Sequence, residues 1–329
     1  MSDSALSLNK PQLLEMYDDM LTIRRFEEKA IDLFGKGLIP GLIHLSIGQE
    51  AVATGVCANL RGDDYILSTH RGHGHCLAKH ADPSKMLAEL LGKETGYCKG
   101  RGGSMHVGVP ELGILGCTGV VGAGIPIATG VGLSIQVRGT DQVVVSFFGE
   151  GATNSGAFHE GLNLAAVWNL PVVFVCENNL YMEFTPINET TRVADMAEKA
   201  SAYKMPSEVV DGMDVLKVYE VAKRAVQRAR TGGGPTMLEL KTYRYRGHHE
   251  GDVKRGATYR SEEEMRAWEA RDPIIIFRDY LLKSKAVTEQ ELDRIQLEAE
   301  ARIEEAARFA VESPQPSPDN ATDYVFVSK

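Results

Sequence analysis

The sequence has no long hydrophobic run, which limits the classes of protein to which it can belong. Its longest apolar stretches, such as Val143–Phe148 and Pro171–Cys176, fall far short of the ~20 residues that a membrane-spanning helix needs. The N-terminal residues also lack the basic and apolar regions of a secretory signal peptide. We therefore expect a cytoplasmic protein with no membrane partner.

Cysteine is scarce, and its positions are scattered along the chain. The five cysteines stand at positions 57, 76, 98, 117 and 176, and no two of them form a Cys-x-x-Cys pair. An odd, scattered set of cysteines argues against a disulfide framework, and the absence of a Cys-x-x-Cys pair argues against a structural zinc site. Reduced, partly buried thiols in a cytosolic protein are the expected state.

Basic residues are in deficit. The chain of 329 residues has 36 Lys and Arg against 45 Asp and Glu, which gives a formal net charge of −9. No nucleic-acid partner is expected, because that binding depends on Lys and Arg that contact phosphates. A local basic cleft for a small phosphate is still compatible with this balance, since net charge does not report the local field. With 43% hydrophobic residues, the length allows one large domain or two modest ones around a sizeable core.

The middle of the chain alternates short apolar runs with helical patterns, which is typical of a parallel α/β sheet. The predicted strands are 143–148, 172–176 and 237–242, and the predicted helices are 11–35, 49–60, 83–91, 155–168 and 214–230. From Ser261 to Glu312 the sequence is charged and helical. Glycines concentrate between Gly96 and Gly124, which indicates backbone packed closely against a neighbour rather than a flexible tether.

Two polar segments directly follow predicted strands: Gly149-Glu-Gly-Ala-Thr-Asn-Ser-Gly156 and Cys176-Glu-Asn-Asn179. If their strands are adjacent and parallel, Glu150 and Asn179 converge at the sheet edge where open α/β sheets bind ligands. A carboxylate, an amide oxygen and a backbone carbonyl would suit magnesium, and the glycines would let backbone amides approach a phosphate. The alternative is a simple glycine turn into a helix, with the asparagines as local turn formers.

Other phosphate-binding motifs do not match the sequence. Asn154 stands where the dinucleotide fingerprint Gly-x-Gly-x-x-Gly needs its third glycine after Gly149, and no Gly-Lys-Ser/Thr follows a glycine loop.

Histidines are dense in His70-Arg-Gly-His-Gly-His75, and His248 follows the last predicted strand. Zinc is one alternative for them, but the dense run has no helical His-x-x-x-His pair, so neutral imidazoles that bind phosphate or move protons fit better. For any single histidine, a packed or surface position is an equally good interpretation.

Five motifs in order give the chain its resemblance to a known family. They are Gly41-Leu-Ile-His-Leu-Ser-Ile-Gly-Gln-Glu50, Thr69-His-Arg-Gly-His-Gly-His75, Lys99-Gly-Arg-Gly-Gly-Ser-Met-His106, the Gly149 segment with Asn178-Asn179, and Tyr243-Arg-Tyr-Arg-Gly-His248. Over about residues 12–315 the chain resembles the alpha subunits of thiamin-diphosphate-dependent 2-oxo acid and acetoin dehydrogenases.

The resemblance implies a thiamin-diphosphate-binding α/β fold. A helical segment at 1–40 would precede a domain at 41–260, in which a central, mainly parallel sheet is flanked by helices. A helical C-terminal region at 261–329 would pack on the same domain or at a subunit interface.

The resemblance also implies the residues of the site. Glu150, the amide oxygen of Asn179 and the carbonyl of Tyr181 would bind Mg²⁺, and Gly151, Ala152, Arg71 and His248 would meet the diphosphate of the cofactor. His70, at a position that is usually tyrosine in the pyruvate branch, would also bind the cofactor. Gly119 and Val121 would lie beside the aminopyrimidine, and His44 would sit in the substrate channel. Catalytic roles are implied for His44, His70 and His248.

The chain departs from the family pattern at several positions. Glu150 replaces the usual aspartate, so the metal geometry must accommodate one more methylene. Met182 and Glu183 replace small residues, and His249 stands where mammalian pyruvate enzymes have a phosphorylated serine, so that control site is absent. The glycine-containing, charged segment 248–259 is expected to be a mobile loop that orders over the diphosphate.

The resemblance implies half of an active site. In this family the glutamate that activates the pyrimidine ring comes from a separate beta subunit, so we expect an assembly of two alpha and two beta chains. The acyl product would pass to a lipoyl-bearing acyltransferase. The segments His70-Arg-Gly-His-Gly-His75 and His248-His-Glu-Gly-Asp252 look closest to those of acetoin dehydrogenases, so acetoin is the expected substrate. Pyruvate and then a branched-chain 2-oxo acid are the alternatives, because only a difference in pocket shape worth ~1–3 kcal/mol separates these substrates. From a different class, a noncatalytic scaffold subunit is the remaining alternative.

Overall fold

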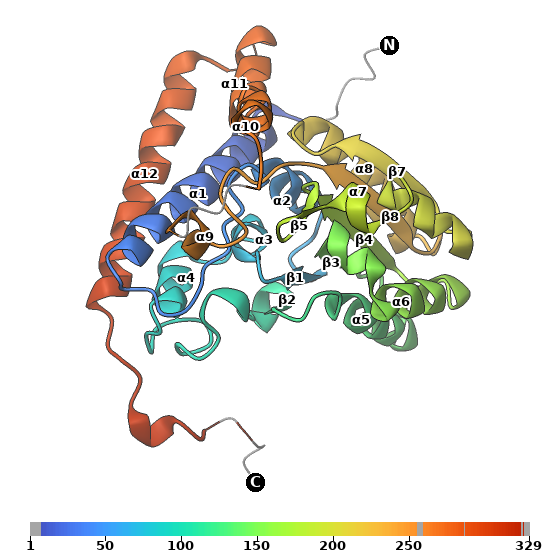
Figure 1. The fold of residues 1–329 in the computed structure, drawn as a ribbon, viewed down its shortest axis with the longest axis horizontal. Helices are drawn as coiled ribbons and strands as arrows, with labels where there is room; N and C mark the ends of the chain where they lie inside the picture. The colour runs from blue at the N-terminus through green and yellow to red at the C-terminus, as the bar shows by residue number, and fades with distance from the viewer. Residues whose placement is uncertain (1–7, 255–258, 286, 324, 326–329) are drawn as a thin grey trace.

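A computed structural model describes residues 8–254, 259–285, 287–323 and 325 of the chain. Its centre is a six-stranded parallel sheet with the strand order β2-β1-β3-β4-β8-β7 (Figure 1). The strands are β1 (Tyr65–Thr69), β2 (Ile114–Thr118), β3 (Val144–Gly149), β4 (Val172–Asn178), β7 (Ser207–Asp211) and β8 (Thr236–Lys241). A separate antiparallel pair, β5 (Tyr181–Met182) and β6 (Thr185–Pro186), follows β4.

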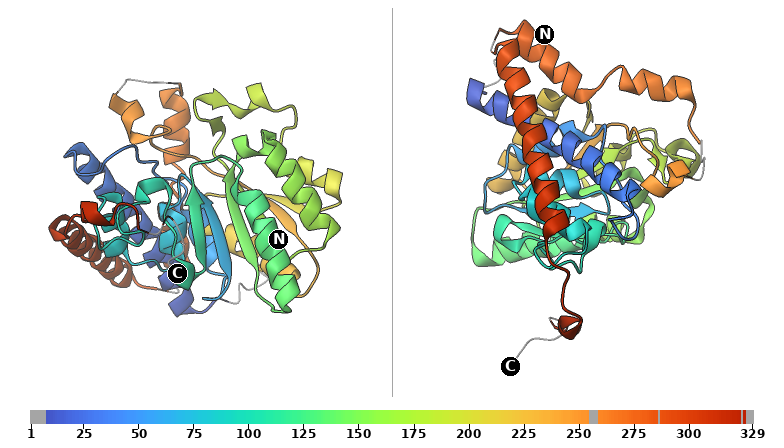
Figure 2. Two further views of the ribbon diagram at one scale, coloured as in Figure 1. Left: turned by 90° about the horizontal axis from the view of Figure 1, so that it is seen from below. Right: turned by 90° about the vertical axis from the view of Figure 1, so that its left-hand side faces the viewer.

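Both faces of the sheet are buried under helices, as the apolar sequences of its central strands require. One face packs against α5 (Gly124–Arg138), α6 (Gly156–Val167) and the 3₁₀ helix η4 (Met196–Tyr203). The other face packs against α1 (Lys10–Gly35), α2 (Glu50–Cys57), α3 (His73–Ala78), α4 (Pro83–Leu90), α8 (Val215–Arg230) and α12 (Glu289–Glu312). In the left view of Figure 2, the green helices α5 and α6 lie on one side and the blue α1 and red α12 on the other.

The C-terminal helices are attached to the N-terminal ones. After α10 (Glu262–Glu269) and α11 (Pro273–Lys283), the long helix α12 packs along α1 and α4 (Figure 2, right). The predicted helical stretch from Ser261 to Glu312 is therefore confirmed, but it is divided into separate helices, the second of which begins at Pro273. None of the helices in the described ranges combines the length and the apolar composition needed to cross a bilayer.

Short elements complete the chain. They are α7 (Ile187–Thr190), α9 (Glu250–Lys254) and the 3₁₀ helices η1 (Gly103–Met105), η2 (Pro110–Leu112), η3 (Glu150–Asn154) and η5 (Pro318–Asn320).

The strand order locates the ligand-binding edge. From β1 the chain first crosses to β2 on one side and later returns to β3 on the other, so the connections diverge between β1 and β3. At such a switch point the loops after the strands separate and leave a crevice beyond the carboxyl ends. Thr69 ends β1 and Gly149 ends β3, so the segments 70–75 and 150–156 border this crevice.

Candidate active site

A cavity of about 430 Å³ occupies the crevice beyond β1, β3 and β4. All the residues that the sequence singled out line it: His44, His70, Arg71, Gly119, Val121, Glu150, Gly151, Ala152, Asn179, Tyr181 and His248. They come from segments far apart in the chain, and the fold brings them to one place.

Oxygen atoms from two neighbouring strand ends meet on one side of the cavity. Strands β3 and β4 are paired in parallel with Gly149 opposite Glu177, which confirms the adjacency assumed from the sequence. The Glu150 carboxylate accepts a hydrogen bond from the backbone amide of Asn179 at 3.2 Å. The side-chain oxygen of Asn179 in turn accepts one from the amide of Tyr181 at 3.4 Å.

The electrostatics of this oxygen cluster favour a cation. Glu150 is only 2% exposed. Burial raises its pKa to about 7, although backbone amides and the charges of Arg244 and Arg71 act in the opposite direction. A divalent cation would stabilise the buried carboxylate. Carboxylate, amide and carbonyl oxygens are the ligands that Mg²⁺ prefers, so this donor set fits that ion.

The backbone beside Glu150 is shaped by a close contact. A Cβ atom added to Gly151 would lie 2.6 Å from Cγ of Met182, so this position has room for glycine alone. Met182, one of the departures from the family pattern, therefore packs directly over the glycine turn. Helix α6 begins just beyond this turn, with Ser155 as its N-cap. The N-terminus of a helix favours anions, so a phosphate group would suit this region.

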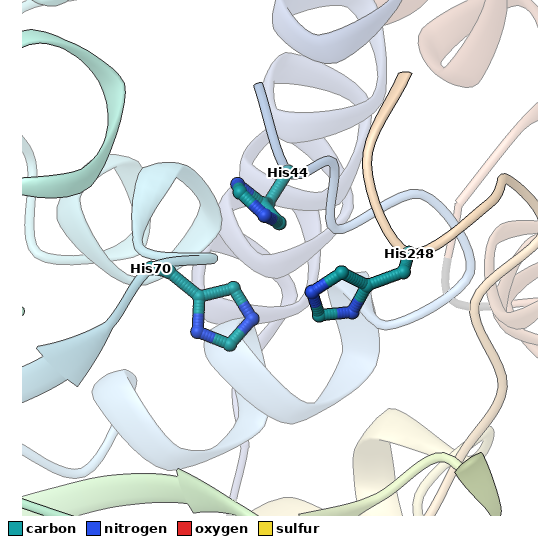
Figure 3. Close-up of side chains that lie close together, drawn as sticks. All are labelled: His44, His70 and His248. Carbon is teal, nitrogen blue, oxygen red and sulfur yellow. The ribbon is translucent and has the colours of Figure 1, made fainter. Parts of the chain in front are cut away.

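Three imidazole rings that line the cavity converge (Figure 3). The ring centroids of His44 and His70 are 4.7 Å apart, those of His44 and His248 are 5.0 Å apart, and those of His70 and His248 are 5.4 Å apart. Burial, with Arg71 next in effect, lowers the pKa of His44 and His248 to about 2 and that of His70 to about 3. The rings are therefore neutral near pH 7.

Arg71 fixes the loops that carry these histidines. Its guanidinium donates to the carbonyl of Leu45 at 2.5 Å and to the carbonyl of His248 at 3.1 Å. Arg71 is buried, and burial together with the nearby Arg244 lowers its pKa to about 10, so it keeps its charge at neutral pH. The lining of the cavity thus combines a cationic guanidinium with oxygen atoms that could ligate a metal ion. This combination suits a phosphate group that is bound together with a metal ion.

Sequence reasoning did not assign a role to Arg244, although the residue lies inside the Tyr243–His248 motif. Arg244 is 1% exposed, lines the cavity and donates to the carbonyls of Tyr181 and Glu183 and to the hydroxyl of Tyr259. Its partners come from distant segments, so no local spacing could have identified it. The motif itself was the only signal.

Helix α10 is tied to the same region. The Glu264 carboxylate accepts hydrogen bonds from the hydroxyls of Tyr181 and Tyr243, each at 2.8 Å. The carbonyl of Tyr181 is an expected metal ligand, so this contact links α10 to the metal side of the cavity. Of the segment 248–259 that was predicted to be mobile, residues 255–258 lie outside the described residues, and Glu250–Lys254 forms α9.

Comparisons with known proteins show the family of the chain. The family model described as "Dehydrogenase E1 component" matches residues 18–319. The alpha subunit of acetoin:2,6-dichlorophenolindophenol oxidoreductase from Bacillus subtilis (strain 168) is 49% identical, over 98% of this chain and 96% of its own. The corresponding subunit from Cupriavidus necator is 44% identical, over 99% of this chain and 97% of its own. The pyruvate dehydrogenase E1 component subunit alpha from Porphyra purpurea is 41% identical, over 98% and 94% respectively. The chain therefore belongs to the dehydrogenase E1 component family, as an alpha-type subunit of thiamin-diphosphate-dependent oxidoreductases.

Proposed function

We propose that this chain is the alpha subunit of an acetoin dehydrogenase. The observation that carries the proposal is the gathering, in one cavity, of all the residues that correspond to the family's cofactor and metal positions. The choice of acetoin is supported by identities of 49% and 44% to two acetoin oxidoreductase alpha subunits, against 41% to a pyruvate dehydrogenase subunit. Pyruvate is the second candidate, and a branched-chain 2-oxo acid is the third.

Mg²⁺ and the diphosphate would be held together in the cavity. Glu150, Asn179 and Tyr181 would ligate the metal ion through a carboxylate, an amide oxygen and a carbonyl. The diphosphate would lie against Gly151, Ala152, Arg71, His70 and His248. When bound, thiamin diphosphate supplies the carbanion that attacks a carbonyl and the ring that accepts electrons during carbon–carbon cleavage.

The remaining cavity residues would bind the other end of the cofactor and the substrate. Gly119 and Val121 line the cavity, where they would lie beside the aminopyrimidine ring. His44 would face the substrate. Because the rings of His44, His70 and His248 are neutral, each can donate a hydrogen bond from one ring nitrogen and accept one at the other.

Alpha subunits of E1 components work with a beta subunit, and we place the beta chain of this enzyme over the cavity. Val120, Val121 and Ile127 are 67%, 59% and 49% exposed, and the two valines line the cavity. Such exposed apolar side chains are typical of a surface that a partner covers. An assembly of two alpha and two beta chains, with transfer of the acyl group to a lipoyl-bearing acyltransferase, completes the proposal.

A second apolar surface would face the sister subunit. On α11 and α12, Ile275, Leu297 and Phe309 are 58%, 65% and 42% exposed, which supports an interface role for the C-terminal region. We also place the protein in the cytoplasm, where the five unpaired cysteines would stay reduced.

Steady-state turnover of the chain coexpressed with its beta subunit tests the proposal. The assay contains thiamin diphosphate, Mg²⁺ and an artificial electron acceptor, with acetoin, pyruvate and a branched-chain 2-oxo acid in parallel. The highest kcat/KM is expected with acetoin. A preference for a 2-oxo acid would make the enzyme a decarboxylating dehydrogenase. Assembled subunits that bind no cofactor would favour the noncatalytic scaffold alternative instead.

A further inference from the structure

The three convergent histidines have the donor geometry of a transition-metal site. His44 lies between α1 and α2, His70 directly follows β1, and His248 follows β8, so three separate segments each contribute one ring. One ring nitrogen from each residue lies within 4.8 Å of those of the other two. Figure 3 shows the three rings turned toward a common point.

The ring separations agree with those of a three-histidine zinc site. Zinc binds imidazole nitrogen at about 2.0–2.1 Å with tetrahedral angles, which places the centres of three ligand rings about 5 Å apart. The observed centroid separations are 4.7, 5.0 and 5.4 Å. The ring nitrogens lie within 4.8 Å of one another, whereas two tetrahedral nitrogen ligands of zinc lie ~3.3 Å apart, so the rings would have to turn inward to bind the ion.

The histidines also have unused bonding capacity. The Nδ1 atoms of His44 and His248 are buried and make no hydrogen bond within the part of the chain that the structure describes. His44 is only 6% exposed. Buried polar atoms are normally satisfied, so these two nitrogens indicate that the cluster is built to contact a ligand. Neutral imidazole is also the form that binds metals.

Positive charge near the cluster limits the kind of metal complex that could bind there. The guanidinium of Arg71 donates to the carbonyls of Leu45 and His248, and that of Arg244 donates to carbonyls of the β5 region, so neither competes for the ring nitrogens through these bonds. Their charges still disfavour a bare cation. A metal ion here therefore needs an anionic fourth ligand, such as hydroxide.

We propose that His44, His70 and His248 form a second metal site, for a borderline dication such as Zn²⁺, separate from the oxygen site at Glu150. Zinc prefers nitrogen donors, whereas Mg²⁺ prefers oxygen donors, so the two sites select different ions. His70 and His248 are also the residues assigned to the diphosphate. The metal and the cofactor consequently exclude each other, and zinc inhibits loading of the enzyme. This competition rests on the proposed function, but the metal site itself does not.

Cobalt provides the direct test of the metal site. Co²⁺ is added to the tag-free complex of alpha and beta subunits after removal of thiamin diphosphate and Mg²⁺. The expected result is one Co²⁺ per alpha chain with the intense visible absorption of tetrahedral coordination, which Zn²⁺ then displaces. The variants His44→Gln, His70→Gln and His248→Gln should each bind Co²⁺ about tenfold more weakly or worse. His159→Gln, which removes an exposed imidazole on α6, is the matched control and should behave as wild type.

The outcomes separate the metal site from the cofactor site. Absence of the tetrahedral spectrum, or the same spectrum in folded His44→Gln protein, would overturn the metal site. If the site exists, thiamin diphosphate with Mg²⁺ should remove the cobalt absorption in a concentration-dependent way. Simultaneous binding of cobalt and cofactor would keep the histidine site but contradict both the competition and the placement of the diphosphate beside it.

Discussion

Among single residues, Glu150 is the one on which the proposed metal site depends most. It is a buried carboxylate beside the amide of Asn179, and a cation would remove the cost of keeping it charged there. Glu150→Gln keeps the size of the side chain but removes its charge. We expect thiamin diphosphate to bind this variant at least about tenfold more weakly in the presence of Mg²⁺, a loss of ~1.4 kcal/mol or more, as measured by titration calorimetry.

Two further variants test whether the loss of cofactor affinity comes from a metal ion bound at Glu150. Glu160→Gln removes an exposed carboxylate from α6 and should leave cofactor affinity unchanged. Glu150→Asp restores the charge on a shorter side chain, so it should recover most of the affinity if the metal binds here. Equal Mg²⁺ dependence in wild type and Glu150→Gln would show that the metal lies elsewhere.

Asp19 on α1 makes stability depend on pH. Burial raises its pKa from 3.8 to about 8, with Asp18 and Glu15 adding to the effect and Arg302 opposing it. Between about pH 4 and pH 8 the folded protein therefore binds more protons than the unfolded chain, so stability falls as the pH rises. Asp19→Asn should weaken this fall and raise the free energy of unfolding by ~1 kcal/mol or more at pH 8.

Thermal unfolding of the metal-free protein at several pH values measures this effect. The midpoint of Asp19→Asn should exceed that of wild type near pH 8, and the two should approach each other near pH 4. Asp279→Asn, at an exposed position on α11, serves as the control and should follow the wild-type curve. Parallel curves for wild type and Asp19→Asn would mean that Asp19 titrates normally in the folded protein.

At the scale of elements, the glycine-rich segment after α4 is folded around one carboxylate. Glu89 is fully buried and accepts hydrogen bonds from the backbone amides of Cys98, Gly100, Gly102 and Gly103 at 2.8–3.0 Å. Side chains on several of these glycines would collide with backbone; a Cβ on Gly102, for example, would lie 2.4 Å from the carbonyl oxygen of His106. The close packing predicted for this segment is therefore confirmed, and the loop leads to Met105 in the cavity wall.

The replacement Glu89→Gln should destabilise this loop. An amide group offers one acceptor oxygen, and its nitrogen would face backbone N–H groups that need acceptors. We expect a loss of about 2–3 kcal/mol in the free energy of unfolding, measured by urea denaturation, because buried donors are left unsatisfied. Glu111→Gln, at an exposed position, is the control. A variant as stable as wild type would show that water or a loop rearrangement replaces these bonds.

The elements that the sequence predicted are those with strong local patterns. The strands at 143–148, 172–176 and 237–242 correspond to β3, β4 and β8, with ends shifted by one or two residues. The strands β1, β2 and β7 were missed: β2 contains glycine, and β7 has exposed Ser207, Glu208 and Val209, so neither shows a buried apolar run. Helix α5 was also missed, because its glycines and β-branched residues weaken the helical pattern.

A site residue could be predicted from the sequence where its position follows from sheet geometry, and not where it depends on packing between distant segments. Glu150 and Asn179 each follow a recognisable strand, so their meeting could be inferred from sheet geometry alone. His44 and His248 lie in loops whose positions depend on packing between distant segments, and only the family resemblance connected them. The bonds of Arg244 to the β5 region depend in the same way on tertiary structure.

At the scale of the whole molecule, one surface of the chain is unusually apolar. Residues 124–137 of α5 contain no charged side chain, and Ile127 is 49% exposed on this helix. The neighbouring Val120 and Val121 are also exposed, at the edge of the cavity. An exposed apolar surface that continues from an active-site cavity is expected to be buried in the assembled enzyme. We therefore expect the beta subunit to contact α5.

The variant Ile127→Glu tests this placement, because burial of an unpaired carboxylate at a subunit interface is costly. We expect copurification of the beta subunit to fall about tenfold or more, while the circular dichroism of the alpha chain stays that of wild type. Val209→Glu introduces the same charge at a 43% exposed position on the edge strand β7, and it should leave assembly intact. If the beta subunit copurifies equally with both variants, its contact surface lies away from α5. Loss of assembly in both would instead indicate an effect of net charge, which a Val209→Lys variant would then reverse.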